Sequence, residues 1–138
     1  PRLSRFLFGE WIKTKDIEYV YENKESVTSA ASYVDKMGAK HLRKIILSNE
    51  SFICEDYISG NFETALLNWR LEPGNWIIEN QKVLGKNMSI YFFCDNQEII
   101  PELTETKESL YYQKFSLLPS VSIQFQRPTK IITKFVLK

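Results

Sequence analysis

Val121-Ser122-Ile123-Gln124-Phe125-Gln126 alternates apolar and polar side chains at every position. A period of two places successive side chains on opposite faces of a β-strand, so this stretch predicts a strand with one buried face. The same alternation recurs at residues 88–93 and 17–21. The chain is therefore predicted to be mainly β.

Turn-forming residues divide the rest of the chain at intervals of roughly ten residues, which is typical of an antiparallel meander. Arg127-Pro128-Thr129-Lys130 predicts a hairpin that leads into a final strand at 131–137. Because a closed sheet has no unpaired edges, we expect an up-and-down antiparallel β-barrel. The other candidate turns are Asn49-Glu50-Ser51, Ser59-Gly60-Asn61, Glu72-Pro73-Gly74-Asn75, Gly85-Lys86-Asn87, Asp95-Asn96 and Leu118-Pro119-Ser120.

Two stretches have the apolar spacing of a helix rather than a strand. Leu3, Phe6 and Leu7 predict a short N-terminal helix that ends near Gly9. A second helix is predicted where apolar residues repeat between a possible cap at Ser26 and a stop at Gly38. The apolar residues of this second helix are Val27, Ala30, Ala31, Val34 and Met37.

Length and composition indicate one globular domain spanning residues 1–138. Eighteen basic residues against seventeen acidic ones leave a net charge of +1, which argues against a nucleic-acid binder. No apolar run is long enough to cross a membrane, and no signal peptide is expected. Cys54 and Cys94 belong to no metal-binding or disulfide pattern, so we interpret both as buried thiols in a reducing compartment.

Motifs for conventional catalysis are missing from the sequence. His41 is the single histidine and is interpreted as a surface residue, because no nucleophile pattern accompanies it. No phosphate-binding loop, dinucleotide fingerprint, zinc motif or calcium loop occurs, so no metal and no resident cofactor are expected.

Gly9-Glu10-Trp11 follows the predicted short helix and precedes a predicted strand. This placement resembles the G-x-W signature of the lipocalin-like (calycin) barrels. In those barrels the indole plugs one end and a basic residue from a late strand lies over it, a contact that a planar guanidinium suits. The resemblance implies that Arg127 or Lys134 fills that place here.

The layout is also similar to the phycobiliprotein lyases of the S-type and T-type group, through the stretches 6–14 and 105–120. That resemblance implies a bilin chaperone or lyase, which holds an open-chain tetrapyrrole in the barrel and delivers it to a cysteine of an antenna phycobiliprotein. The chain departs from the family pattern after its Pro turn, where Ser122 and Gln124 replace arginine, and its acidic residues Glu105 and Glu108 lie upstream of the family's position.

A bilin would need cations for its propionates and a carboxylate for its pyrrole nitrogens. Arg70, Arg127 and Lys134 are candidates for the first role, and Glu63, Glu72 and Glu108 for the second, with Glu108 as the candidate catalytic residue. Aromatic side chains with polar tips would line a half-wet cavity, and the densest such stretch is the turn at residues 69–76. The aromatic candidates are Tyr19, Tyr21, Trp69, Trp76 and Tyr91.

Alternative functions remain open at this point. A lipocalin-like or fatty-acid-binding-like carrier of a small apolar acid would use the same cavity without catalysis, and an interaction module would have a fully packed core. The expected partners are a phycobilin as bound substrate and a phycobiliprotein subunit as acceptor, with a homodimer as one possible state. The expected location is the cytoplasm or the plastid stroma.

If the resemblance holds, the absorption spectrum of a bilin is expected to change when it is mixed with the purified protein. Trp69→Ala is expected to weaken this binding because it removes an aromatic wall from the predicted cavity mouth. Titration followed by absorbance measures the effect, and unchanged affinity would remove residues 69–76 from the site.

Overall fold

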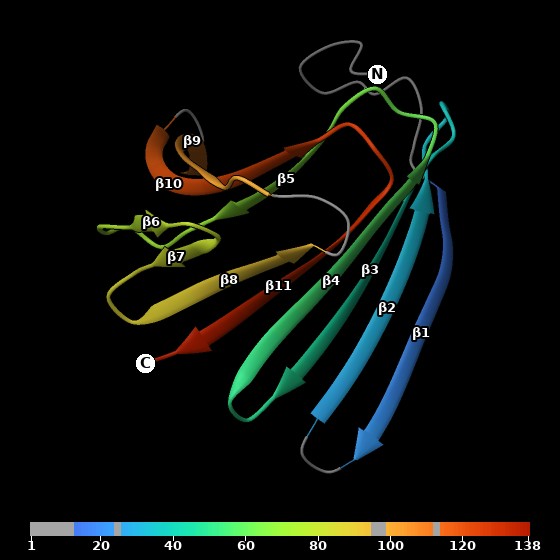
Figure 1. Cartoon of the computed structure of the whole chain (residues 1–138), viewed down its shortest axis with the longest axis horizontal. Coiled ribbons are helices and arrows are strands. Elements are labelled where there is room, and N and C mark those ends of the chain that lie inside the picture. The colour runs from blue at the N-terminus through green and yellow to red at the C-terminus, as the bar shows by residue number, and fades with distance from the viewer. Residues whose placement is uncertain (1–12, 24–25, 95–98, 112–113) are drawn as a thin grey trace.

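The computed structural model describes residues 13–23, 26–94, 99–111 and 114–138. Within these ranges the chain forms β-strands joined by turns and loops, and it contains no helix (Figure 1). No helix long and apolar enough to cross a membrane therefore occurs in the described part of the chain. The strands are β1 (Lys13–Asn23), β2 (Ser26–Val34), β3 (Ala39–Ser48), β4 (Ser51–Gly60), β5 (Ala65–Arg70), β6 (Ile77–Glu79), β7 (Lys82–Leu84), β8 (Met88–Cys94), β9 (Glu102–Tyr111), β10 (Lys114–Phe125) and β11 (Thr129–Leu137).

The strands form two antiparallel sheets. The large sheet has the order β1-β2-β3-β4-β11-β8-β7-β6, and the small sheet has the order β5-β10-β9. Figure 1 shows the last strand, β11, between β4 and β8. Among the described residues β1 and β6 remain the two edges of the large sheet, so the expected closed barrel is wrong and the architecture is an open pair of sheets.

The hydrophobic core lies between the two sheets. The large sheet contributes Ile90, Phe92 and Ile131, and the small sheet contributes Val121 and Ile123, all with at most 1% of their surface exposed. This inner face of the large sheet is covered at β8 and β11, but on β2 the inner positions Val27 and Tyr33 stay exposed. The small sheet therefore covers only part of the large one.

The predicted helix at residues 26–38 is wrong, because this stretch is strand β2 with β1 on one side and β3 on the other. The residues that were expected to be buried on a helical face include Val27, which is exposed, whereas Thr28 is buried. Two neighbouring strands satisfy the backbone groups of β2, and its β-branched residues favour a strand. The strand ends at Val34, and Gly38 lies in the turn that leads into β3, where its φ of 90° suits glycine.

The predicted strands are confirmed at 88–93, 121–125 and 131–137, and 17–21 lies within β1. The hairpin at residues 127–130 is wrong, because β10 pairs in the small sheet and β11 pairs in the large one. The connection instead carries the chain from one sheet to the other.

Among the predicted turns, residues 49–51 join β3 to β4, residues 85–87 join β7 to β8, and 72–75 lie in the loop after β5. The turn at 118–120 is wrong, because Pro119 lies inside β10 opposite Glu105. The Pro119 carbonyl accepts a hydrogen bond from the N–H of Leu71, the residue after β5, at 2.8 Å. The turn at 95–96, the N-terminal helix and the Gly9-Glu10-Trp11 motif lie outside the described residues.

Phe92 and Phe93 give a direct test of this architecture, because they are neighbours on opposite faces of β8. Phe92 is 1% exposed and Phe93 is 48% exposed. We expect Phe92→Ala to lower the free energy of unfolding by about 3–5 kcal/mol, since it opens a cavity in the core. Phe93→Ala is expected to cost less than about 1 kcal/mol. Urea unfolding of both variants measures the difference, and equal losses would contradict the placement of the core.

Candidate functional site

The most unusual feature of the inner face is a buried carboxylate. Asp56 lies on β4 opposite Arg43 of β3, and its side chain is 1% exposed. Arg43 donates two hydrogen bonds to it, from Nε to Oδ1 at 2.7 Å and from the second terminal nitrogen to Oδ2 at 3.1 Å. His41 Nε2 lies 2.6 Å from Oδ1, and because a carboxylate only accepts, the imidazole nitrogen is the donor.

Arg43 also connects the two sheets. Its guanidinium carbon lies 4.8 Å from the centre of the Trp69 ring, which belongs to β5 of the small sheet. The Trp69 ring in turn meets Phe135 of β11 edge to face at 5.0 Å. Bonds to Asp56 on one side and the indole on the other therefore fix the orientation of the guanidinium.

The surroundings of Asp56 shift two pKa values, that of Asp56 itself and that of Cys54. Burial raises the pKa of Asp56, but the hydrogen bonds from His41 and Arg43 outweigh it and hold the pKa below its usual value. Burial and the nearby Asp56 carboxylate raise the pKa of Cys54 to about 12. Its Sγ lies 3.5 Å from Asp56 Oδ2. Cys54 is a buried thiol, as expected, and its high pKa makes it a poor nucleophile.

One side of this cluster faces open space. The side chain of Arg43 is 35% exposed. Tyr33 of β2, which lies opposite His41 of β3, is 37% exposed. The Tyr33 and His41 rings meet edge to face with centroids 5.0 Å apart. Ala31, opposite Arg43 on β2, is exposed as well. Tyr33, His41 and Arg43 thus border an open part of the inner face. We name these three residues and Asp56 the inner site.

The inner site offers a fixed cation, an imidazole and an aromatic ring. No group of three or more potential metal ligands occurs among the described residues. The arrangement is suited to holding an anionic group against the guanidinium while an apolar or sugar surface contacts Tyr33.

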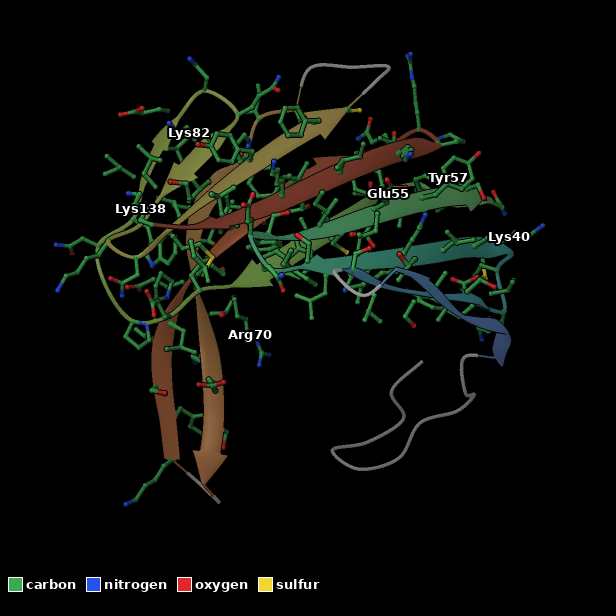
Figure 2. The ribbon with its side chains drawn as sticks, turned by 90° about the horizontal axis from the view of Figure 1, so that it is seen from below. Lys40, Glu55, Tyr57, Arg70, Lys82 and Lys138 are labelled. Atoms are coloured by element: carbon green, nitrogen blue, oxygen red, sulfur yellow. The ribbon has the colours of Figure 1, made fainter. Side chains whose placement is uncertain are left out.

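Among the predicted ligand-binding residues whose side chains the structure describes, Trp69 contacts the inner site. Arg70 follows it on β5 and is exposed (Figure 2). Trp76 lies elsewhere, where its indole N–H donates to the Glu72 carbonyl at 3.0 Å and its ring packs against Gly85. The two tryptophans of the 69–76 stretch therefore occupy separate places.

The remaining predicted residues are spread over both sheets. Tyr91 lies on β8 with the Lys82 amine 5.4 Å above its ring. Arg127 borders an open pocket of about 480 Å³ beside the small sheet, and Glu108 lies on β9 opposite Ser116. On β1, Tyr19 pairs with Ser29 and Tyr21 with Val27. Among these predicted residues, the described side chains of Trp76, Tyr91, Arg127 and Glu108 do not share one cavity.

Sequence reasoning overlooked Tyr33, Arg43 and Asp56, and it interpreted His41 as a surface residue. The available signal was the alternation of Lys40-His41-Leu42-Arg43-Lys44, which places His41 and Arg43 on one face. The lysines on either side of these two residues made the stretch resemble a fully solvated one. Cys94, expected to be buried, is half-buried.

The chain has clear structural likenesses, although no family model and no curated protein matches its sequence. Two structures of heparinase III, the BT4657 gene product, match with TM-scores of 0.77 and 0.75 at 16% identity, over 88% and 92% of this chain. Heparan sulfate lyase HepC from Pedobacter heparinus matches with a TM-score of 0.72 at 13% identity over 91% of this chain.

This chain spans about a fifth of those proteins, 21% of heparinase III and 22% of HepC. At this level of identity the likeness shows the fold, which is that of a β-sheet domain of heparan sulfate lyases. The resemblance to phycobiliprotein lyases is thereby corrected, because the likeness is to this domain and the described sheets form no closed barrel. Bilin attachment stays a prediction that depended on the corrected resemblance.

Asp56→Asn is expected to lower the free energy of unfolding at pH 7 by about 3–5 kcal/mol, because it removes one partner of a buried ion pair. Since the folded-state pKa of Asp56 is lowered, its contribution is complete above about pH 4 and is lost as the pH falls through the folded-state value. The difference between wild type and variant is therefore expected to shrink toward pH 3, as measured by urea unfolding.

Glu55→Gln is the matched control, because Glu55 is the next residue on β4 and forms a partly exposed ion pair with Lys130 at 3.2 Å. We expect it to change stability by less than about 1 kcal/mol. Equal losses from Asp56→Asn and Glu55→Gln at pH 7 would contradict the structural role of Asp56.

Proposed function

We propose that this chain is a β-sandwich domain that binds an acidic polysaccharide, with the inner site engaging a carboxylate or sulfate group of the sugar. The observation that carries the proposal is the oriented Arg43 guanidinium at the open edge of the inner face. The likeness to domains of heparan sulfate lyases supports the choice of an acidic polysaccharide as ligand.

The chemistry of the inner site fits such a ligand. Arg43 uses Nε and one terminal nitrogen for Asp56, and among the described residues no hydrogen bond engages its other terminal nitrogen. A guanidinium binds carboxylate and sulfate oxygens through charge-assisted hydrogen bonds. Because Asp56 and Trp69 already hold the guanidinium in place, little conformational entropy is lost when it binds a ligand.

The Tyr33 ring supplies the second part of the contact. It lies next to His41 and is exposed on the same open face as Arg43. Sugar rings present C–H faces that pack on aromatic side chains, while their acidic groups project sideways toward a cation. An acidic sugar over β2 would satisfy both side chains at once.

A small apolar acid is a second candidate ligand, and one pocket favours it. This pocket, of about 310 Å³, opens at the β3–β4 turn and is lined by Leu47, Phe52, Trp69, Phe135 and Leu137 among others. Its volume is at the lower limit of sites for drug-sized molecules. A fluorescent fatty acid that binds wild type but not Leu47→Asp would support this candidate, and absence of binding would remove it.

Arg43→Lys provides the test of the polysaccharide proposal, because lysine keeps the charge but loses the fork and the stacking on Trp69. We expect its affinity for heparan sulfate oligosaccharides to fall about tenfold, or about 1.4 kcal/mol, by isothermal titration calorimetry. Circular dichroism checks that the variant remains folded.

Arg70→Lys is the matched control, since Arg70 is an exposed arginine on β5 outside the inner site. It is expected to bind like wild type, and a neutral glucan is expected not to bind. The proposal would be overturned if Arg43→Lys bound heparan sulfate as tightly as wild type, or if the neutral glucan bound equally well.

A further inference from the structure

The outer face of strands β2–β4, β6–β8 and β11 in the large sheet, turned away from the small sheet, has an excess of positive charge. On strands β2–β4, β6–β8 and β11 the register places five lysines on this face but only two acidic residues, Glu55 and Glu79. The chain as a whole has a net charge of only +1. Solubility alone is served by mixed charges of both signs, so this segregation calls for another explanation. The lysines are Lys40, Lys44, Lys82, Lys130 and Lys134.

Four of these lysines follow β4 in a regular zigzag. Successive rows of the sheet pair Lys40 with Ser59, Lys130 with Tyr57, Lys44 with Glu55, and Lys134 with Ile53. Lys40 and Lys44 belong to β3 on one side of β4, and Lys130 and Lys134 belong to β11 on the other. Because rows on one face are two residues apart, an amine occurs about every 7 Å, alternately on each side.

We propose that this lysine track, defined as Lys40, Lys130, Lys44 and Lys134 around Tyr57, binds a linear acidic polysaccharide lying along β4. The choice of ligand class rests on the proposed function, but the surface is separate from the inner site and faces the opposite way. Figure 2 shows Lys40, Glu55 and Tyr57 on the side of the large sheet away from the β9–β10 hairpin.

The spacing of the track selects a polymer over a small anion. A single sulfate or carboxylate needs donors that converge on one point, whereas these amines stand in separate rows. A polysaccharide with an acidic group on each repeating unit can contact several of these amines at the same time. Because the contacts are linked through one ligand, together they bind it more tightly than any one of them alone. The lysine ammonium acts as a point charge and binds sulfate and carboxylate groups alike.

Tyr57 favours a sugar over other polyanions. It lies in the middle strand of the track between Leu42 and Lys130, and it is 47% exposed. Leu42 is also exposed, at 44%. The track thus has an apolar centre on which a sugar ring packs, flanked by amines that reach its acidic substituents.

Glu55 lies inside the track and opposes a polyanion. Its carboxylate holds Lys130 at 3.2 Å, so it both repels the ligand and occupies one of the four amines. Removing this charge is therefore expected to strengthen binding, an effect of opposite sign to the loss of a lysine.

The experiment measures binding of heparan sulfate oligosaccharides by calorimetry at several salt concentrations. Lys40→Gln combined with Lys130→Gln is expected to weaken binding at least tenfold and to flatten its salt dependence. Glu55→Gln is expected to strengthen binding about threefold, or about 0.7 kcal/mol. Lys107→Gln, on β9 of the small sheet, removes the same charge elsewhere and is expected to bind nearly as wild type does.

The outcomes separate this inference from the proposed function. If Arg43→Lys weakens binding but the track variants do not, the inner site stands and the track is overturned. If only the track variants change binding, the track stands and the inner site fails. Equal effects of Lys107→Gln and the double track variant would overturn the track, as would single-stranded DNA that binds as tightly as heparan sulfate through the same lysines.

Discussion

The pairing of β11 with β4 on one side and β8 on the other holds the molecule together. These ladders join the meander β1–β4 to the later strands, and Ile131, which is paired in both ladders, is completely buried. The same register fixes both faces of β4, because Asp56 lies opposite Ile131 and the next residue, Tyr57, lies opposite Lys130. A slip of one residue would exchange the two faces and destroy the inner site and the lysine track together.

The two faces of β4 show how one strand supports two different chemistries. Toward the small sheet, Asp56 is desolvated, and its charge is balanced by Arg43 while His41 donates a hydrogen bond to it. Toward solvent, Glu55 forms only a partly exposed ion pair with Lys130. The charges on the inner face are thus few and fixed, whereas those on the outer face are more numerous and more hydrated.

Much of the strand content could be predicted from the sequence, because alternation is a local signal and strands such as β8, β10 and β11 carry it clearly. The pairing of the strands could not be predicted, since nothing in the sequence near Arg127-Pro128 indicates that β10 and β11 enter different sheets. The helix predicted around Val27 failed for a related reason: two neighbouring strands outweighed the local spacing of apolar residues. Among the predicted site residues with described side chains, Trp69 meets the inner site. Asp56 was missed because its partners are distant in the sequence.

The unequal environments of the two cysteines have a practical consequence. Cys54 is buried in the core and its pKa is raised, so we expect alkylating reagents and peroxides not to react with it in the folded protein. Cys94, at the end of β8, is half-buried. Of the two thiols in the sequence, Cys94 is therefore the more accessible one for attaching a fluorophore or spin probe.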